Sequence, residues 1–230
     1  ELFSKEKGKV NKQLSEPVCY IVGAMPMTES FSPQINDLVI AADAGLLNLE
    51  SLHIIPDIII GDFDSLGHVP TKPQTIRYPK EKNDTDMMLA IKTGLKSNYK
   101  QFVLYGGIGG RLDHTLANIQ ALAYLANRDA QGYLIGQGTV MTAIRNSTLT
   151  FNQKMAGTLS VFSLDKTAEG VSLRGLKYPL RDATLKNDWA LGVSNEFTEK
   201  TATITVKNGT LLILWYSDTF DVSTVVNTPF

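Results

Sequence analysis

Between residues 18 and 144, short apolar segments alternate with segments of helical periodicity, and this alternation limits the fold more than any other feature. Several of the apolar segments are continuously apolar, which is typical of strands covered on both faces. The strand candidates are residues 18–23, 38–43, 57–62, 75–79, 101–106 and 132–136, and the helix candidates are residues 84–97 and 113–128. Alternating strands and helices predict a mostly parallel sheet with crossover helices.

After about residue 145 the pattern changes. Segments 147–152, 157–164, 170–175 and 201–216 are rich in β-formers, and Lys207-Asn208-Gly209 carries the residue types of a hairpin turn. We therefore predict an α/β catalytic domain followed by an all-β sandwich domain. The predicted divisions are an N-terminal extension over residues 1–17, an α/β domain over 18–144 and a β-sandwich domain over 145–230.

Composition excludes several classes of protein. The net charge of −1 gives no general attraction to nucleic acid or to an anionic membrane, and no apolar segment approaches the roughly 18 residues of a membrane span. The single cysteine, Cys19, excludes a disulfide framework within one chain and fits a reducing compartment, so we expect a cytoplasmic protein. Residues 1–17 are polar and lysine-rich and lack the apolar core of a signal peptide.

Two carboxylates, Asp62 and Asp64, follow the apolar strand candidate at 57–62. Side chains at i and i+2 of an extended chain point the same way, so these two charges face one region and need a compensating partner. Asp43 follows the preceding strand candidate, and ligands of open parallel sheets bind beyond the carboxyl ends of the strands. Carboxylates without histidine or cysteine suit Mg²⁺, which often binds together with phosphate oxygens.

A glycine-rich segment, residues 106–110, leads from the strand candidate at 101–106 towards the helix candidate at 113–128. Gly107, Gly109 and Gly110 allow backbone N–H groups to approach phosphate, and Arg111 adds a fixed charge. These residues also have plainer interpretations. The glycines form a flexible turn in one, and Asp84, at the start of the helix candidate at 84–97, is a simple helix N-cap in the other. The sequence contains no P-loop motif, and the glycine pattern does not match the dinucleotide fingerprint.

Taken together, six segments resemble the thiamin pyrophosphokinase family. The segments are residues 41–49, 56–66, 82–91, 106–119, 175–180 and 192–197. The resemblance implies an α/β catalytic domain, a β-sandwich domain, Mg²⁺, ATP as donor, thiamine as acceptor and a homodimer. It also implies the reaction, in which the thiamine hydroxyl attacks the β-phosphorus of ATP to give thiamine diphosphate and AMP.

The resemblance also assigns roles to individual residues. It implies Asp62, Asp64 and Asp86 as metal ligands and catalytic residues, with Asp43 and Thr85 nearby. Arg111 and Asp113 are expected beside the phosphates, and Tyr178, Ser194 and Asn195 in the thiamine site. The chain departs from the family's pattern at Asn83-Asp84, where relatives often carry the first acid one position earlier.

Two other functions use the same residues. A Mg²⁺-dependent phosphohydrolase would release inorganic phosphate without needing thiamine. A non-catalytic nucleotide-binding module would bind the nucleotide and form no product. The β-rich domain, with its segment 192–197, favours a dedicated acceptor site over both, and residues 175–197 supply Tyr178 and Trp189 as aromatic candidates for it. That site and the phosphate site fall in different predicted domains, and the resemblance implies that the thiamine pocket forms between two subunits.

Overall fold

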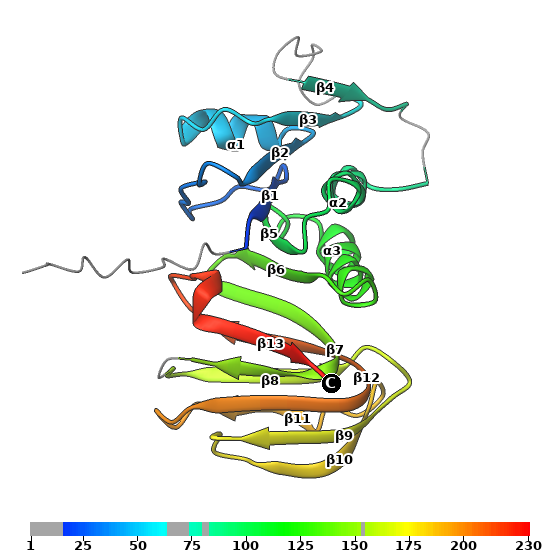
Figure 1. The fold of residues 1–230 in the computed structure, drawn as a ribbon, viewed down its shortest axis with the longest axis vertical. Coiled ribbons are helices and arrows are strands. Elements are labelled where there is room, and N and C mark those ends of the chain that lie inside the picture. The colour runs from blue at the N-terminus through cyan, green and yellow to red at the C-terminus, as the bar shows by residue number, and fades with distance from the viewer. Residues whose placement is uncertain (1–15, 64–73, 80–82, 153–154) are drawn as a thin grey trace, which may run out of the picture.

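The computed structural model describes residues 16–63, 74–79, 83–152 and 155–230. Within these described residues, the α/β part contains three helices and six strands, and the remaining strands follow in the β part (Figure 1). The elements of the α/β part are β1 (Val18–Val22), β2 (Leu38–Ala42), α1 (Gly45–Ser51), β3 (Ile58–Gly61), β4 (Gln74–Arg77), α2 (Asp86–Lys96), β5 (Gln101–Tyr105), α3 (Leu112–Ala126) and β6 (Gln131–Gly136). Those of the β part are β7 (Thr139–Phe151), β8 (Thr158–Ser163), β9 (Thr167–Arg174), β10 (Leu180–Lys186), β11 (Gly192–Glu196), β12 (Ala202–Tyr216), the 3-10 helix η1 (Val222–Thr224) and β13 (Val225–Pro229).

The sheet is parallel in its first part and antiparallel in its second. The strand order is β10-β9-β12-β7-β6-β5-β1-β2-β3-β4, and each neighbouring pair from β6 to β4 is parallel. The β6–β7 pair and the pairs of the β part are antiparallel. All six strands expected before residue 144 are present. The helix α1, which the sequence reading missed, follows Asp43 directly.

Two long strands connect the parts. β7 runs through residue 145, where the sequence predicts a domain boundary, and pairs with β6 through its first half and with β13 through its second. β12 pairs with β9 through residues 203–208 and with β8 through residues 211–215. β7 and β12 therefore each take part in two groups of strands, one through each half of their length. The side chains between these two groups form a core that includes Phe151 and Trp215.

The hairpin predicted at Lys207-Asn208-Gly209 is wrong. These residues lie inside β12, at a register shift against β7 between Val206 and Thr210. Gly209 adopts φ +114°, and its N–H donates to Asn146 Oδ1 of β7 at 2.9 Å. The turn-forming residues therefore make a bulge, which bends one strand where it changes partners instead of reversing the chain.

Two apolar cores cover opposite faces of the parallel strands. The helices α2 and α3 pack on one face, where Cys19 is fully buried and burial raises the pKa of its thiol. The sequence pattern predicts an apolar stripe on α3 formed by Leu116, Ile119, Ala123 and Ala126, but Leu116 is 56% exposed and the other three are only partly buried. A different side of the helix faces the sheet, and it includes one polar residue. The buried residues on that side are Asn118, Ala121, Leu122 and Leu125. None of the described helices is long and apolar enough to cross a membrane.

Candidate active site

Two predicted acids follow neighbouring parallel strands. Asp43 comes directly after β2 and Asp62 directly after β3, and the N–H of Asp43 donates to the carbonyl oxygen of Ile60 at 2.7 Å. A methyl group added to Gly61 would lie 3.3 Å from Asp43 Oδ1, so the carboxylate of Asp43 lies over the end of β3. Asp43 and Phe63 both adopt positive φ, and the buried ring of Phe63 anchors the second turn. Positive φ is common for aspartate in turns but uncommon for a bulky residue such as Phe63, so the turn after β3 is locally constrained.

The third predicted ligand, Asp86, is the first residue of α2. Asp64 lies outside the described residues, and among those that are described no group of three or more acidic, histidine or cysteine side chains is close enough to hold a metal ion. The predicted set of Asp62, Asp64 and Asp86 therefore stays a prediction. All of its ligand atoms would be carboxylate oxygens, which fits a hard cation such as Mg²⁺.

The start of α2 separates two residues that the sequence left ambiguous. Thr85 is the N-cap, and its side-chain oxygen accepts a hydrogen bond from the N–H of Met88 at 3.2 Å. Asp84 does not cap the helix: its Oδ2 lies 2.6 Å from Lys92 Nζ, and both side chains are about one-third exposed. The hydrogen bond that Lys92 donates to Asp84 is the main cause that raises the pKa of Lys92. Asp84 thus pairs with Lys92 of α2, the helix that follows it.

The glycine-rich segment is held by direct backbone contact with the loop after β1. Gly106, Gly109 and Gly110 adopt φ values of +61°, +92° and +62°. The N–H of Met25 donates to the carbonyl oxygen of Gly106 at 3.0 Å, and a Cβ on Gly23 would lie 2.6 Å from that same oxygen. Glycine is favoured here because Gly106, Gly109 and Gly110 adopt the left-handed conformation, and because Gly23 and Gly106 approach each other too closely for a side chain.

Two asparagines that the sequence reading missed hold these loops. Asn118 of α3 is 6% exposed, and its Nδ2 donates to the carbonyl oxygen of Gly107 at 2.8 Å. Asn48 of α1 donates from Nδ2 to the carbonyl oxygens of Gly23 and Met25, each at 2.9 Å. Both lie inside the segments that resemble the family, and an asparagine on the apolar side of a helix is the signal that would have found Asn118.

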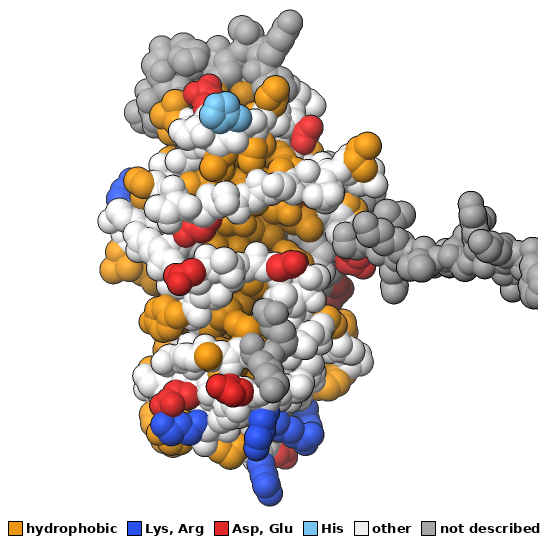
Figure 2. All heavy atoms as spheres, turned by 90° about the vertical axis from the view of Figure 1, so that its left-hand side faces the viewer, with side chains coloured by type: hydrophobic (Ala, Val, Ile, Leu, Met, Phe, Trp, Pro, Cys, Tyr) orange, Lys and Arg blue, Asp and Glu red, His pale blue; other side chains and the backbone are white. Residues whose placement is uncertain are grey.

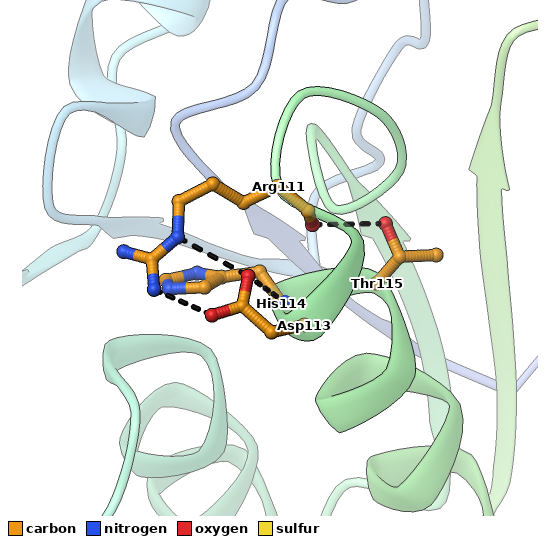
Figure 3. A network of polar contacts seen from close by, with 4 residues as sticks. All are labelled: Arg111, Asp113, His114 and Thr115. Carbon is orange, nitrogen blue, oxygen red and sulfur yellow. Dashed lines mark hydrogen bonds and ion pairs between the residues drawn. The ribbon is translucent and has the colours of Figure 1, made fainter.

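Arg111 and Asp113 form a forked ion pair at the start of α3 (Figure 3). Arg111 Nε lies 3.2 Å from Asp113 Oδ1, and an Arg111 terminal nitrogen lies 2.6 Å from Oδ2. The N–H of His114 also donates to Asp113 Oδ1 at 3.0 Å. The hydrogen bond from Arg111 is the largest cause that lowers the pKa of Asp113, and the N–H of His114 lowers it further. Both side chains are 65% exposed, so the guanidinium is accessible to an anionic ligand.

In the β part, Asn195 supports the chain at Tyr178. Asn195 is 3% exposed, its Nδ2 donates to the carbonyl oxygen of Tyr178 at 2.7 Å, and its Oδ1 accepts from the N–H groups of Tyr178 and Glu196 at 3.0 and 2.9 Å. The ring of Tyr178 is 56% exposed, and Lys177 Nζ lies 5.5 Å from its centre. The amide of Asn195 is therefore engaged with backbone, while the ring it holds in place faces outward.

Ser194 lies next to this support, at an irregularity in β11. It adopts φ +58°, its side chain is exposed, and the β11–β8 register shifts between Gly192 and Asn195. The N–H of Ser194 donates to Ser160 Oγ at 3.1 Å. The shift turns the hydroxyl of Ser194 outward beside Asn195.

The acids and the tyrosine lie far apart within one chain. Tyr178 precedes β10 and Asp62 follows β3, and seven strands lie between β10 and β3 in the sheet order. Strands are spaced about 4.8 Å apart, so eight steps along a flat sheet span roughly 38 Å. Figure 1 shows β10 and β3 at opposite ends of the molecule.

A parallel sheet with acids and a glycine loop at its strand ends, extended by an antiparallel β part, is typical of α/β proteins that bind phosphate groups. Comparison with known proteins narrows this class. Residues 34–134 match the family model described as "Thiamin pyrophosphokinase, catalytic domain", and residues 146–211 match "Thiamin pyrophosphokinase, vitamin B1 binding domain". The chain belongs to the thiamin pyrophosphokinase family.

Curated relatives and solved structures agree with this assignment. Thiamine pyrophosphokinase of Bacillus subtilis is 27% identical over 188 residues, which cover 79% of this chain and 88% of the relative. Thiamin pyrophosphokinase 1 of Caenorhabditis elegans is 24% identical over 171 residues, covering 69% of this chain and 68% of the relative.

Among solved structures, thiamine pyrophosphokinase of Bacillus subtilis superposes with a TM-score of 0.77 at 23% identity, over 88% of this chain and all of that chain. The Geobacillus thermodenitrificans enzyme superposes with a TM-score of 0.74 at 26% identity, over 90% and 99% of the two chains. The chain is thus a thiamine diphosphokinase, which transfers pyrophosphate from ATP to thiamine.

Proposed function

We propose that ATP binds at the carboxyl ends of β2, β3 and β5, and that the thiamine hydroxyl is brought to it by the β part of a second subunit. The observation that carries the first half is the placement of Asp43 over the end of β3, beside Asp62. The backbone of the glycine loop and Arg111 supply donors for phosphate oxygens on the neighbouring side. Phosphoryl-type transfer depends on such positioning and charge more than on covalent help from the protein.

In the reaction, the hydroxyl oxygen of thiamine bonds to the β-phosphorus, and the bond from that phosphorus to the oxygen bridging to the α-phosphate breaks. AMP leaves with the bridging oxygen, and the hydroxyl proton passes to a carboxylate of the site or to water. Arg111 is expected to turn from Asp113 to the phosphates, or to contact both. Mg²⁺ held by Asp62, Asp64 and Asp86 would supply charge neutralisation of the triphosphate.

The test of the reaction is an incubation of the purified chain with ATP, Mg²⁺ and thiamine. We expect AMP and thiamine diphosphate in equal amounts. ADP with thiamine monophosphate would contradict transfer of a pyrophosphoryl group. Inorganic phosphate released without thiamine would indicate a phosphohydrolase, and ATP binding without any product would indicate a nucleotide-binding module.

The second half of the proposal is a shared site in a homodimer. The separation of Tyr178 from the strand-end acids in one chain, with seven strands between them, supports it. The short hydroxyethyl arm of thiamine cannot bridge that separation, so a second copy has to bring its Tyr178 and Ser194 to the acids of the first. Asn195 then acts on thiamine through Tyr178, whose backbone it holds.

Mixed dimers test the shared site. Asp62→Asn subunits, which lack the phosphate side, are combined with Tyr178→Ala/Ser194→Ala subunits, which lack the thiamine side. A shared site predicts that the heterodimer regains up to one working site although each homodimer has none. A heterodimer that is demonstrated to form yet stays inactive would place the whole site within one chain.

A further inference from the structure

The face of the parallel sheet opposite α2 and α3 carries an open groove. The connection from β1 to β2, residues 23–37, contains no helix, so the strands β1, β5 and β6 are left partly uncovered on this face. The groove has a volume of about 810 Å³ and lies between this connection and the η1–β13 segment. Figure 2 shows hydrophobic side chains exposed across the middle of this side of the molecule, with acidic side chains around them.

Aromatic rings make up much of the groove. The ring of Phe31, from the connection, stacks on Tyr20 of β1 with centres 4.6 Å apart and on Tyr105 of β5 at 4.9 Å. On the other side, Tyr133 of β6 lies 4.7 Å from Phe220. None of the hydrogen bonds found among the described residues involves the hydroxyl of Tyr20, Tyr105 or Tyr133, although all three rings line the groove. Such a lining favours a flat ring as occupant.

The charge around the groove is negative. Its charged lining residues are Glu16, Asp37 and Asp221, and no lysine or arginine lines it in the described part of the chain. Burial, and then the charges of Asp37 and Asp221, raise the pKa of Tyr20 to about 12. A cation over aromatic faces and near carboxylates is attracted by both.

Two amide oxygens in the lining lack a donor. Gln101 Oε1 and Asn227 Oδ1 are buried and accept no hydrogen bond from a described residue. The orientation of Asn227 is fixed because its Nδ2 donates to Gln131 Oε1 at 2.7 Å. Gln131 is itself 6% exposed and donates to Thr142 Oγ1 and to the carbonyl oxygen of Ala143. Buried acceptors without donors are costly, so they mark places where a ligand with N–H groups gains binding energy.

From these observations we propose that the groove is a second ligand site, for a small organic cation with a flat nitrogen-containing aromatic ring and an N–H donor. The site is separate from the thiamine-binding stretch, since none of its lining residues falls within residues 146–211, the segment that matches the vitamin B1 binding domain. The cation lies between the stacked rings and the acidic rim, and the N–H donor bonds to Gln101 Oε1 or Asn227 Oδ1. Because Tyr105 immediately precedes the glycine loop, occupancy contacts the residue from which that loop starts.

Three matched probes test the three parts of the proposal by calorimetric titration of the full chain. 1-Methylnicotinamide carries the cation, the ring and an amide N–H; nicotinamide lacks the charge; N-methylpyridinium lacks the N–H. The first is expected to bind about tenfold or more tightly than either of the others. Thiamine, which belongs to the same chemical class, is expected to bind with two sites per chain where the groove and the active site are both filled.

Two arginine variants on β13 locate the site. Val226→Arg places a positive charge in the groove lining, where Val226 is 44% exposed. Thr228→Arg adds the same charge on the same strand, at an exposed position outside the lining. Binding of 1-methylnicotinamide is expected to weaken about tenfold in the first variant and to stay unchanged in the second.

A third variant, Gln101→Met, removes one orphan acceptor at similar volume. It is expected to weaken 1-methylnicotinamide and to leave N-methylpyridinium unaffected. If none of the probes binds, or if binding is equal in the wild type and all three variants, the groove is not a ligand site and the proposal is wrong. Circular dichroism and gel filtration of each variant establish that it folds and assembles as the wild type does.

Discussion

At the carboxyl ends of the parallel strands, two loops are held by direct backbone contact together with the amides of Asn48 and Asn118, whereas in the β part the chain at Tyr178 is held by one buried amide. The glycine loop after β5 and the loop after β1 approach so closely that a methyl group on Gly23 would lie 2.6 Å from the carbonyl oxygen of Gly106. Around Tyr178, by contrast, the amide of Asn195 spans a gap and satisfies three backbone groups.

The difference indicates how each region responds to change. Backbone contact leaves no room for any side chain, so substitutions there act through clashes and left-handed strain. A side-chain amide can be replaced by a carboxylate or removed altogether, so the hydrogen bonds that it makes can be lost partly or completely. The charged residues add a third kind of response, because they can be neutralised without any change of shape.

The largest effect expected is from Asp62→Asn, which removes charge from the strand-end region and leaves its backbone intact. Transfer of pyrophosphate should fall by about 10³-fold, since the phosphates lose charge-based positioning. Thermal unfolding should be unchanged or slightly improved, because repulsion among carboxylates decreases. The assay is AMP formation at limiting Mg²⁺, with Asp129→Asn, at an exposed turn, as the control. Near-normal turnover of Asp62→Asn would make the metal assignment wrong.

A pair of glycine variants, one from each part, separates contact from strain. Gly106→Ala introduces both backbone strain and a clash, because φ is +61° and the added Cβ would overlap the carbonyl oxygen of Gly23. Gly157→Ala introduces backbone strain alone, because φ is +87° and no atom lies within 4 Å of the added Cβ. We expect the free energy of unfolding to fall by about 3 kcal/mol or more in the first and about 1 kcal/mol in the second. Urea denaturation measures both, and equal losses would show that contact adds nothing.

The two buried asparagine amides should separate the substrates. Asn195→Ala releases the backbone of Tyr178 and is expected to raise the KM for thiamine about tenfold with little change in the KM for ATP. Asn118→Ala releases the carbonyl oxygen of Gly107 and should raise the KM for ATP instead. Asn195→Asp keeps an acceptor for the N–H of Tyr178 and should give an intermediate effect. A similar rise in both KM values for both asparagines would indicate general loosening of the fold.

The smallest effect concerns the exposed pair of Arg111 and Asp113. Because Arg111 lowers the pKa of Asp113 in the folded chain, the stabilisation is present above the unfolded pKa of about 4 and is lost as pH falls through the lowered folded value. The melting temperature of Asp113→Asn should therefore lie slightly below that of the wild type at pH 7, and the difference should vanish in acid and decrease in high salt. A difference that grows in acid would contradict the pairing.

The strands and the two long helices were predictable because their signals are local. Continuous apolar runs such as Ile58–Gly61 identify buried parallel strands without knowledge of their neighbours. The short helix α1 was not predicted, since seven residues hold too few turns for a periodic signal. The turn at Lys207-Asn208-Gly209 was misread, because the same residues serve a hairpin or a bulge and only the partners of the strand decide between them.

The sequence by itself determined the alternation of strands and helices, the order of the acidic and glycine-rich loops and the resemblance to one family, because these depend on residue type and spacing along the chain. Only the tertiary structure decided that Asn118 and Asn195 support loops, that Asp84 pairs with Lys92, and that an aromatic groove opens beside β1, β5 and β6. Such roles depend on which groups from distant segments come within a few ångströms. The chain's spacing does not encode that proximity until the strands have paired.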